Sequence, residues 1–309
     1  MIHIENLVKR YGSLVALDHL NLDIREGEIF GLLGPNGSGK TTAINCILAL
    51  LKYDKGSIRI FGKEMEPDNY EAKRQIGIVQ QNVAVFDEFT VYENIDYFCG
   101  LYINDRKKRK QLVEEAIAFV GLEDYRKIRP KKLSGGLLRR LNIACGIAHK
   151  PRLIILDEPT VAVDPQSRNR ILEGIQQLNR QGSTIIYTSH YMEEVEQICT
   201  RIAIMDHGRS IASGTKEQLT GMIKTGEKVT VEAVVLKEEQ LVQIRELSHV
   251  FKVDYENDIL RVQCTEAKHN LVRILRYLED QEISFGRVYS ELPTLNDVFL
   301  EITGKELRD

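Results

Sequence analysis

The sequence predicts an α/β fold built on a mainly parallel sheet, followed by a small second domain of the α+β class. Over the first 220 residues, short apolar runs typical of buried strands alternate with helical stretches. This alternation favours a parallel sheet with helices on its faces. After residue 220 the order of strands and helices changes. A length of 309 residues also suits two domains, because a domain usually has about 100–200 residues.

The composition narrows the class of protein. Hydrophobic residues make up 43% and charged residues 28% of the chain, and the formal net charge is −3. These values are typical of a globular protein and lack the basic character of a nucleic-acid binder, so we expect no nucleic-acid partner. No stretch reaches the roughly 20 apolar residues of a membrane helix. Glu5 near the start and five cysteines without a CxxC pair favour a cytoplasmic, reducing environment.

Alternating apolar residues predict two half-buried strands near the start, one around Ile2 and Ile4 and one over residues 20–24. The apolar run 29–33 is typical of a buried parallel strand. It leads through a glycine-rich segment, GPNGSGKTT, into a helix predicted over residues 43–51. Further buried strands are expected at residues 76–79, 153–156, 184–188 and 202–205.

The middle of the chain differs from the strands around it. Residues 90–132 have a helical pattern, no strand signal and many Lys and Arg residues. We therefore predict a helical subdomain inserted into the α/β core at about residues 90–150. Its basic runs, 106–110 and 126–132, fit either a patch for nucleic acid or lipid headgroups or a solvated helix face, and the nearly balanced charge favours the solvated face.

The C-terminal segment, which we place at residues 225–309 after a first domain at residues 1–220, has its own pattern. Its elements follow the order β-α-β-β-α-β, which is typical of a ferredoxin-like unit. The first strand is expected where Val229, Val231, Ala233 and Val235 alternate, the other strands at residues 251–255, 259–262 and 284–288, and the helices at residues 238–247 and 268–278.

The glycine-rich segment between the strand and the helix has the pattern of a phosphate-binding loop, or P-loop. In this pattern the backbone N–H groups wrap the phosphates of a nucleotide, a lysine reaches the β- and γ-phosphates, and a hydroxyl binds Mg²⁺. Lys40 and Thr41 take these two roles, and the start of the helix attracts the same anions. The predicted nucleotide-binding residues are Gly34, Pro35, Asn36, Gly37, Ser38, Gly39, Lys40, Thr41 and Thr42.

Two carboxylates follow another predicted strand, in LIILDEPT at residues 153–160. A buried strand that ends in a carboxylate places the charge at the carboxyl edge of the sheet, where α/β proteins bind ligands. We predict that Asp157 binds Mg²⁺ through its water shell. Glu158 is the next residue, and because successive side chains point in different directions it can face an attacking water. This makes it the candidate general base.

A second candidate anion site lies in LSGG, residues 133–136, where Ser134, Gly135 and Gly136 precede a predicted helix. Because the chain has two candidate phosphate sites but only one P-loop, the role of the second site has two alternatives. Either the chain binds two anions, or the second site serves another subunit. Taken alone, LSGG also fits a serine N-cap followed by a glycine turn.

The motifs GPNGSGKTT, LSGG, LIILDEPT and TSH (residues 188–190), in this order, resemble the ATP-binding subunit of an ABC transporter over residues 1 to about 220. The resemblance implies a P-loop NTPase fold and an ATPase that uses ATP and Mg²⁺. In that family the LSGG of one subunit closes on the γ-phosphate held by the P-loop of the other. It therefore implies a head-to-tail homodimer, or a pseudo-symmetric dimer with a second ATPase subunit.

The resemblance also implies roles for single residues. Tyr11 matches the aromatic residue that stacks on adenine, and Asp164 matches the aspartate that crosses the dimer interface. His190 matches the histidine at the γ-phosphate. Gln81 matches the glutamine that contacts Mg²⁺ or the attacking water and senses the transporter partner, although Gln80 is adjacent and the choice stays open. The implied catalytic set is Lys40, Gln81, Glu158 and His190, and the implied metal set is Thr41, Gln81 and Asp157.

Leu137 stands where many relatives have Gln, and VAVD (161–164) replaces the commoner small-residue-Leu-Asp form. The region from LSGGLLRRLNIA to DEPTVAVDPQSR and the tail TLNDVFLEITGKELRD are similar to ATPases of ABC-2 type exporters, which include drug-resistance and sodium-extrusion systems. This similarity implies transmembrane permease subunits and a peripheral position at the cytoplasmic face of the membrane. We expect residues 86–102 to dock the permease.

The alternatives are a soluble ABC-type ATPase that acts on nucleic acid or ribosomes, and a sensor with a ligand-binding C-terminal domain.

Overall fold

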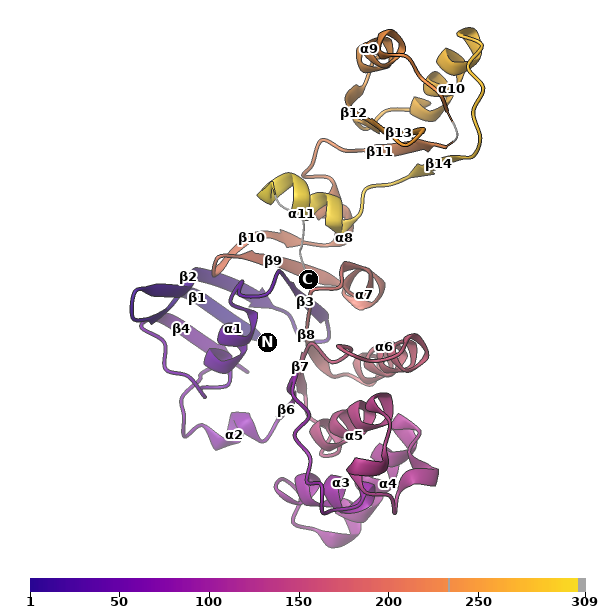
Figure 1. Ribbon diagram of the computed structural model, residues 1–309. Helices are drawn as coiled ribbons and strands as arrows, with labels where there is room; N and C mark the ends of the chain where they lie inside the picture. The colour runs from indigo at the N-terminus through magenta and orange to yellow at the C-terminus, as the bar shows by residue number, and fades with distance from the viewer. Residues whose placement is uncertain (233, 305–309) are drawn as a thin grey trace. The chain divides into compact units, whose positions relative to one another are not determined.

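The computed structural model describes residues 1–232 and 234–304. It separates into two compact units, Met1–Ser213 and a second unit that begins at Gly214 (Figure 1). The second unit starts before residue 220, where the sequence pattern changes. The reason is that the short helix α8 (Lys216–Thr220) packs against α11 (Leu295–Thr303) of the same unit.

A six-stranded sheet forms the centre of the first unit. In spatial order its strands are β10 (Arg209–Gly214), β9 (Arg201–Asp206), β3 (Ile29–Leu33), β8 (Thr184–Ser189), β7 (Leu153–Asp157) and β6 (Ile76–Val79). From β9 to β6 the strands run parallel. These parallel strands confirm the sequence prediction to within one residue at each end, and β10 adds an edge strand that the sequence pattern does not predict.

A second sheet of four strands contains β2 (Leu14–Ile24), β1 (Ile2–Tyr11), β4 (Lys55–Ile60) and β5 (Lys63–Glu64). The two half-buried strands expected near the start are confirmed, but they pair antiparallel with each other. The mainly parallel arrangement thus holds for the six-stranded sheet and not for these strands. The physical reason is that β1 and β2 each have one apolar face, which packs against α1 (Lys40–Ile47) in the main hydrophobic core.

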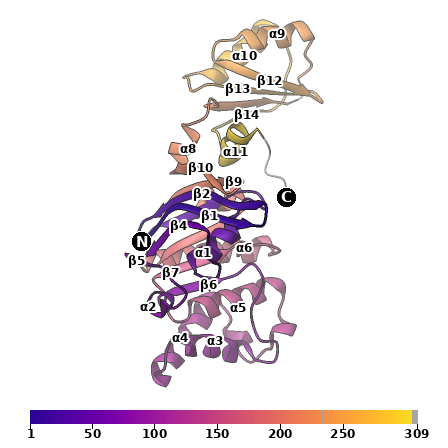
Figure 2. The ribbon, with the colours of Figure 1, turned by 90° about the vertical axis from the view of Figure 1, so that its left-hand side faces the viewer.

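Helices cover the parallel sheet. The helix α1 lies on one side together with the antiparallel sheet, and α6 (Pro165–Arg180) and α7 (Met192–Ile198) lie on the other side (Figures 1 and 2). The helix α1 starts earlier and ends earlier than the predicted range 43–51. Gly39, with φ 104°, directly precedes it, and Ala49, with φ 51°, turns the chain out of the helical conformation.

The predicted helical insertion contains α3 (Val91–Gly100), α4 (Arg106–Val120) and α5 (Gly135–Ile147), which pack against one another. Side-chain caps fix where these helices begin: Thr90 forms a capping box at α3, Asp105 caps α4 and Ser134 caps α5. Gly121, with φ 64°, ends α4. Most of the basic run at the start of α4 is exposed to solvent, as expected for a solvated helix face.

The second unit has the predicted β-α-β-β-α-β order. Its sheet is antiparallel throughout, and the first strand lies between the third and the fourth. Apolar residues of both helices pack with those of the strands in one core. The elements are β11 (Glu227–Val231), α9 (Glu238–Glu246), β12 (Val250–Glu256), β13 (Ile259–Cys264), α10 (Asn270–Asp280) and β14 (Val288–Glu291).

Two strands of this unit differ from the prediction. The first ends at Val231, and Val235 lies outside it with 74% of its surface exposed, while Ala233 falls outside the described residues. The last strand occupies Val288–Glu291 and not residues 284–288, because Ile283 and Phe285 pack on the core from an irregular segment. In the described parts of the chain, none of the helices has the length and apolar character needed to cross a bilayer.

Candidate functional site

The predicted phosphate-binding loop connects β3 to α1, with residues 34–39 in the loop and Lys40, Thr41 and Thr42 in the helix. Lys40 is buried, with 5% of the residue exposed, and its ammonium donates hydrogen bonds to the carbonyls of Gly34, at 2.7 Å, and Pro35, at 3.1 Å. Burial lowers the pKa of Lys40 below its ordinary value, and the carboxylates of Glu158 and Asp157 oppose this shift. The loop therefore wraps around a buried cation.

The loop also has features that suit an anion. A Cβ on Gly34 would lie 2.4 Å from the Met205 carbonyl, and Gly39 combines a positive φ with close approach to Ala16. The Ser38 hydroxyl is buried, and no hydrogen-bond partner reaches it from the described residues. A buried cation, an unpartnered hydroxyl and close-packed backbone suit a phosphate chain. The residues present thus fit the predicted nucleotide.

Asp157 connects three elements at the carboxyl end of β7. Its carboxylate is buried and accepts hydrogen bonds from the Thr188 hydroxyl, at 2.6 Å, and from the Thr41 hydroxyl, at 3.2 Å. The carboxylate of a strand end, the first turn of α1 and the end of β8 therefore meet at one point. Carboxylate and hydroxyl oxygens suit Mg²⁺, so these residues fit the predicted metal.

Glu158 lies at the centre of the site. Its φ of 48° is unusual for a non-glycine residue, and its backbone N–H donates to both oxygens of Thr188, at 3.0 and 3.2 Å. This turn directs the buried carboxylate into the cluster. There it lies 3.6 Å from the Lys40 ammonium and 3.4 Å from His190 Nδ1, and it accepts a hydrogen bond from the Gln81 amide at 3.0 Å. All four predicted catalytic side chains therefore converge.

The structure distinguishes the two adjacent glutamines. The side chain of Gln81 contacts Glu158, whereas Gln80 contributes its backbone carbonyl, which accepts hydrogen bonds from Arg139 at 3.1 Å and from Asn142 at 3.4 Å. Sequence reasoning misses Arg139 and Asn142. The available signal is their spacing of three residues on α5, which puts both on one helix face.

Replacing Gln81 by Ala is expected to lower steady-state ATP turnover on the order of tenfold, because the amide that orients the Glu158 carboxylate is lost. Gln80→Ala is the matched control. It removes an exposed side chain and keeps the carbonyl that Arg139 binds, so turnover should change by less than about twofold. A larger loss in Gln80→Ala than in Gln81→Ala would assign the role to Gln80.

The predicted LSGG site lies apart from this cluster. Ser134 caps α5 by accepting a hydrogen bond from the Leu137 N–H at 3.4 Å. A Cβ on Gly136 would lie 2.4 Å from the Ser167 hydroxyl and 3.0 Å from the Asp164 carboxylate, while a Cβ on Gly135 would lie 3.8 Å from the Ala162 carbonyl, an ordinary contact. Asp164 in turn caps α6. The structure therefore brings Asp164 to LSGG, and among the described residues no hydrogen bond or ion pair joins residues 134–136 to the P-loop.

Tyr11 also lies outside the cluster. It is the last residue of β1, with 49% of its surface exposed, and the Lys9 ammonium lies 5.2 Å from its ring centroid. An exposed ring with a nearby cation is available for stacking on a planar base. The structure shows this availability and no contact between Tyr11 and the catalytic side chains.

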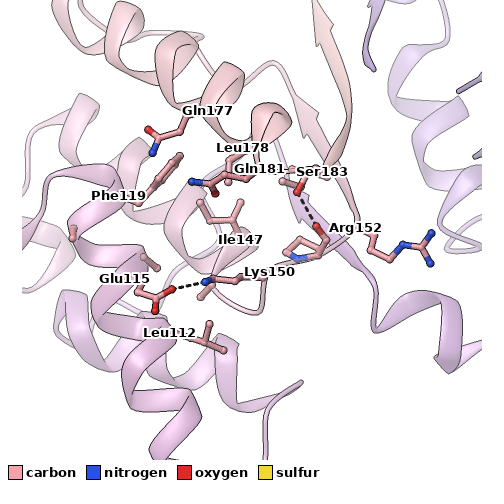
Figure 3. Close-up of a pocket in the computed structure, with 16 residues that line it drawn as sticks. Leu112, Glu115, Phe119, Ile147, Lys150, Arg152, Gln177, Leu178, Gln181 and Ser183 are labelled. Atoms are coloured by element: carbon pink, nitrogen blue, oxygen red, sulfur yellow. Dashed lines mark hydrogen bonds and ion pairs between the residues drawn. The ribbon is translucent and has the colours of Figure 1, made fainter. Parts of the chain in front are cut away.

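A cavity of about 610 Å³ lies elsewhere in the first unit, between α4, α6 and the segment after α5 (Figure 3). Leu112, Phe119 and Leu178 line it, and its Lys150 ammonium pairs with the Glu115 carboxylate at 2.5 Å. The cavity borders the amino ends of β7 and β8. The catalytic cluster lies at their carboxyl ends, where α/β sheets bind ligands. We therefore place the functional site at the cluster.

Comparison with known proteins agrees with this geometry. Residues 17–161 match the family described as ABC transporter. The chain is 39% identical to the linearmycin resistance ATP-binding protein of Bacillus subtilis (strain 168), with 100% of both chains covered. It is 32% identical to a daunorubicin resistance ATP-binding protein of Streptomyces coeruleorubidus, with 99% of this chain and 97% of the relative covered. It is 33% identical to the Nod factor export ATP-binding protein I of Ralstonia nicotianae, over 100% and 95%.

A solved structure is similar to this chain in its fold. A dimeric ATP-binding cassette in a post-hydrolysis state, bound to ADP and Pi, is 28% identical to this chain and aligns with a TM-score of 0.64. The alignment covers 70% of this chain and 98% of the cassette. Together with the convergence of the P-loop lysine and the two strand-end carboxylates, these similarities show that the chain belongs to the ABC transporter family, as an ATP-binding subunit with ATPase activity.

Proposed function

We propose that the chain powers a membrane exporter that confers resistance to a toxic small molecule, acting with separate permease subunits of the ABC-2 type. The observation that supports this function most strongly is the extent of the similarity. The family match ends at residue 161, but relatives named for drug resistance and for Nod factor export match essentially the whole chain, including its C-terminal unit. Such a subunit works at the cytoplasmic face of the membrane. The names favour export over action on nucleic acid or ribosomes.

In the proposed reaction, water attacks the γ-phosphate of ATP in line and yields ADP and phosphate. Glu158 accepts the proton of the attacking water, and His190 and Gln81 hold the carboxylate and the water in position. Lys40 stabilises the charge that develops on the phosphate oxygens. Thr41, Asp157 and Gln81 are the residues that would hold Mg²⁺, which would supply further positive charge at the same phosphates.

We propose that a second copy completes each site. Ser134, Gly136 and Asp164 lie together at the start of α5 and α6, away from the P-loop of their own chain. In a head-to-tail pair, they face the nucleotide held by the other copy. The dimeric state of the similar cassette supports this arrangement. Closure on ATP and opening after hydrolysis then provide the movement that drives transport.

The segment after Gln81 provides the proposed contact with the permease. The buried side chain of Asn94 fixes its shape, because it accepts a hydrogen bond from the Phe86 N–H at 2.7 Å and donates to the Phe86 carbonyl at 3.0 Å. Phe86 and Tyr97 contact each other edge to face, with their ring centroids 5.0 Å apart, and both are exposed. Exposed aromatic residues on a rigid base are typical of protein interfaces.

The chain, tagged and isolated from its native cells in mild detergent, is expected to co-purify with a membrane protein of several transmembrane helices. Replacing Phe86 and Tyr97 by Asp should release that protein and preserve ATP binding, because charges in a desolvated interface core are unfavourable. Tyr70→Asp, which changes an exposed tyrosine on α2 (Tyr70–Lys73), is the matched control and should retain the complex. Co-purification with ribosomes or nucleic acid in place of a membrane protein would contradict the exporter function.

A further inference from the structure

Behind the catalytic cluster lies a buried carboxylate that the reaction above does not use. Glu194, on α7, is 3% exposed. One carboxylate oxygen accepts hydrogen bonds from the Tyr187 hydroxyl at 2.6 Å, the Thr160 hydroxyl at 2.7 Å and the Ser189 hydroxyl at 3.3 Å. The other oxygen lies 3.2 Å from Arg168 Nε in an ion pair. We call these five residues the Glu194 network.

Two members of the network, Thr160 and Ser189, lie in the segments that carry the reactive groups. Thr160 follows Glu158 by two residues, and Ser189 directly precedes His190. Both segments are therefore attached to one carboxylate through their hydroxyl groups. A displacement of Glu194 would act on the proposed base and on its neighbouring histidine together.

Arg168 connects the network to the loop that carries Asp164. It lies in the first turn of α6, and its backbone N–H donates to the Asp164 carbonyl at 2.9 Å. Its guanidinium also lies 5.0 Å from the ring centroid of Tyr191, which is itself 4.1 Å from the ring centroid of His190. Two chains of contacts therefore connect Arg168 with His190. One runs through Glu194 and Ser189, and the other runs through the ring of Tyr191.

Burying the Glu194 carboxylate makes an unfavourable contribution to the free energy of folding. Taking an ionised group out of water costs several kcal/mol unless partners and hydrogen bonds compensate for it. An acidic residue in the first turn of a helix is also favoured by the helix dipole, which is the alternative explanation for Glu194 in α7. Glu193 occupies the same turn and is exposed. It provides the comparison that separates a dipole effect from an effect of the network.

We propose that Glu194 is a positioning residue for ATP hydrolysis, which holds His190 and the Glu158 segment in their reactive arrangement and ties both to the Asp164 loop. The coupling rests on the proposed function, in which Asp164 faces a second copy of the chain. Closure of the second copy onto Asp164 is then transmitted through Arg168 and Glu194 to the groups that position the water.

Glu194→Gln is expected to lower kcat for ATP on the order of tenfold and to change KM by less than about twofold. Glutamine keeps the size of the side chain and removes the charge that holds Arg168. Glu193→Gln, the matched control in the same helical turn, should leave both constants unchanged. Equal values for both variants and the wild type, or a rise in KM with kcat preserved, would overturn the proposal.

A double-mutant cycle tests whether Glu194 acts through His190. In a His190→Ala background, adding Glu194→Gln should lower kcat by a clearly smaller factor than it does in the wild type, because the part of the loss that acts through His190 is already gone. The same fold-loss in both backgrounds would show that Glu194 acts independently of His190 and would overturn the positioning role. Rescue of kcat by Glu194→Asp to within about threefold of the wild type is expected, because the charge is restored.

Dimer closure gives a readout that does not need turnover. In a Glu158→Gln background, Glu194→Gln should raise the ATP concentration for half-maximal dimer formation several-fold, measured by light scattering, while Glu193→Gln should not. If Glu194→Gln fails to melt cooperatively, Arg168→Gln takes its place in all three measurements, because the Arg168 side chain is 32% exposed. If the wild-type chain hydrolyses ATP and dimerises, and the Glu194 and Arg168 variants do both equally well, this inference alone is contradicted. A wild-type chain that does not dimerise with ATP contradicts the proposed function.

Discussion

Glu158→Gln is expected to retain ATP binding and to lose ATP turnover by at least about 100-fold, the lower range of what general-base catalysis contributes. The reason lies in the position of one carboxylate, which is buried and faces Lys40, Gln81 and His190. An amide has nearly the same shape and accepts hydrogen bonds, but it cannot take a proton from water. The nucleotide contacts of the P-loop do not depend on it.

Two measurements check this result. Steady-state phosphate release gives the turnover, and titration with a fluorescent ATP analogue gives the affinity. Glu193→Gln, on the exposed side of α7, is the control for losing one carboxylate from the chain. Turnover at the wild-type rate in Glu158→Gln would remove Glu158 from the role of base and leave His190 as the other candidate in the cluster.

Lys40→Ala is expected to abolish measurable nucleotide binding, with a rise in Kd of at least about 100-fold. The ammonium is the buried cation around which the loop is wrapped, and it lies near two carboxylates. Two charge-assisted hydrogen bonds to phosphate are together worth about 3–6 kcal/mol. Without the lysine, Asp157 and Glu158 also repel the phosphates.

The fluorescent-ATP titration measures this effect directly. Lys52→Ala, at an exposed lysine after the end of α1, is the matched control and should bind as the wild type does. Thermal melting without nucleotide must show that Lys40→Ala is folded. Affinity within about threefold of the wild type in a folded Lys40→Ala chain would contradict the placement of the phosphates at this loop.

The sequence pattern predicts the parallel strands of the first unit closely because their signal is local. A continuous apolar run that is bounded by glycine or polar residues, such as residues 29–33, is a strand buried on both faces. By contrast, β4 has only Ile58 and Ile60 as buried residues, and two apolar residues do not form a run long enough to predict a strand. The strand β14 lies further along the chain than predicted, because the apolar residues Ile283 and Phe285 pack on the core without being part of the strand.

The site is predictable where a motif sets the chemistry, and less so where distant contacts set the geometry. Lys40, Asp157 and Glu158 follow from their motifs. The choice between Gln80 and Gln81 does not, since Arg139 and Asn142 on α5 fix the loop from a distance. The Glu194 network is equally hidden, because Thr160 and Tyr187 approach Glu194 only when β7, β8 and α7 have packed together.

The requirement for a second copy is the claim on which the coupling of ATP to transport depends. The mass of Glu158→Gln in solution with saturating ATP and Mg²⁺, measured by light scattering, tests it most directly. We predict a particle of two chains that forms only with ATP and is lost when Ser134 is also replaced by Arg. A particle of one chain that still binds ATP at full occupancy would contradict the claim.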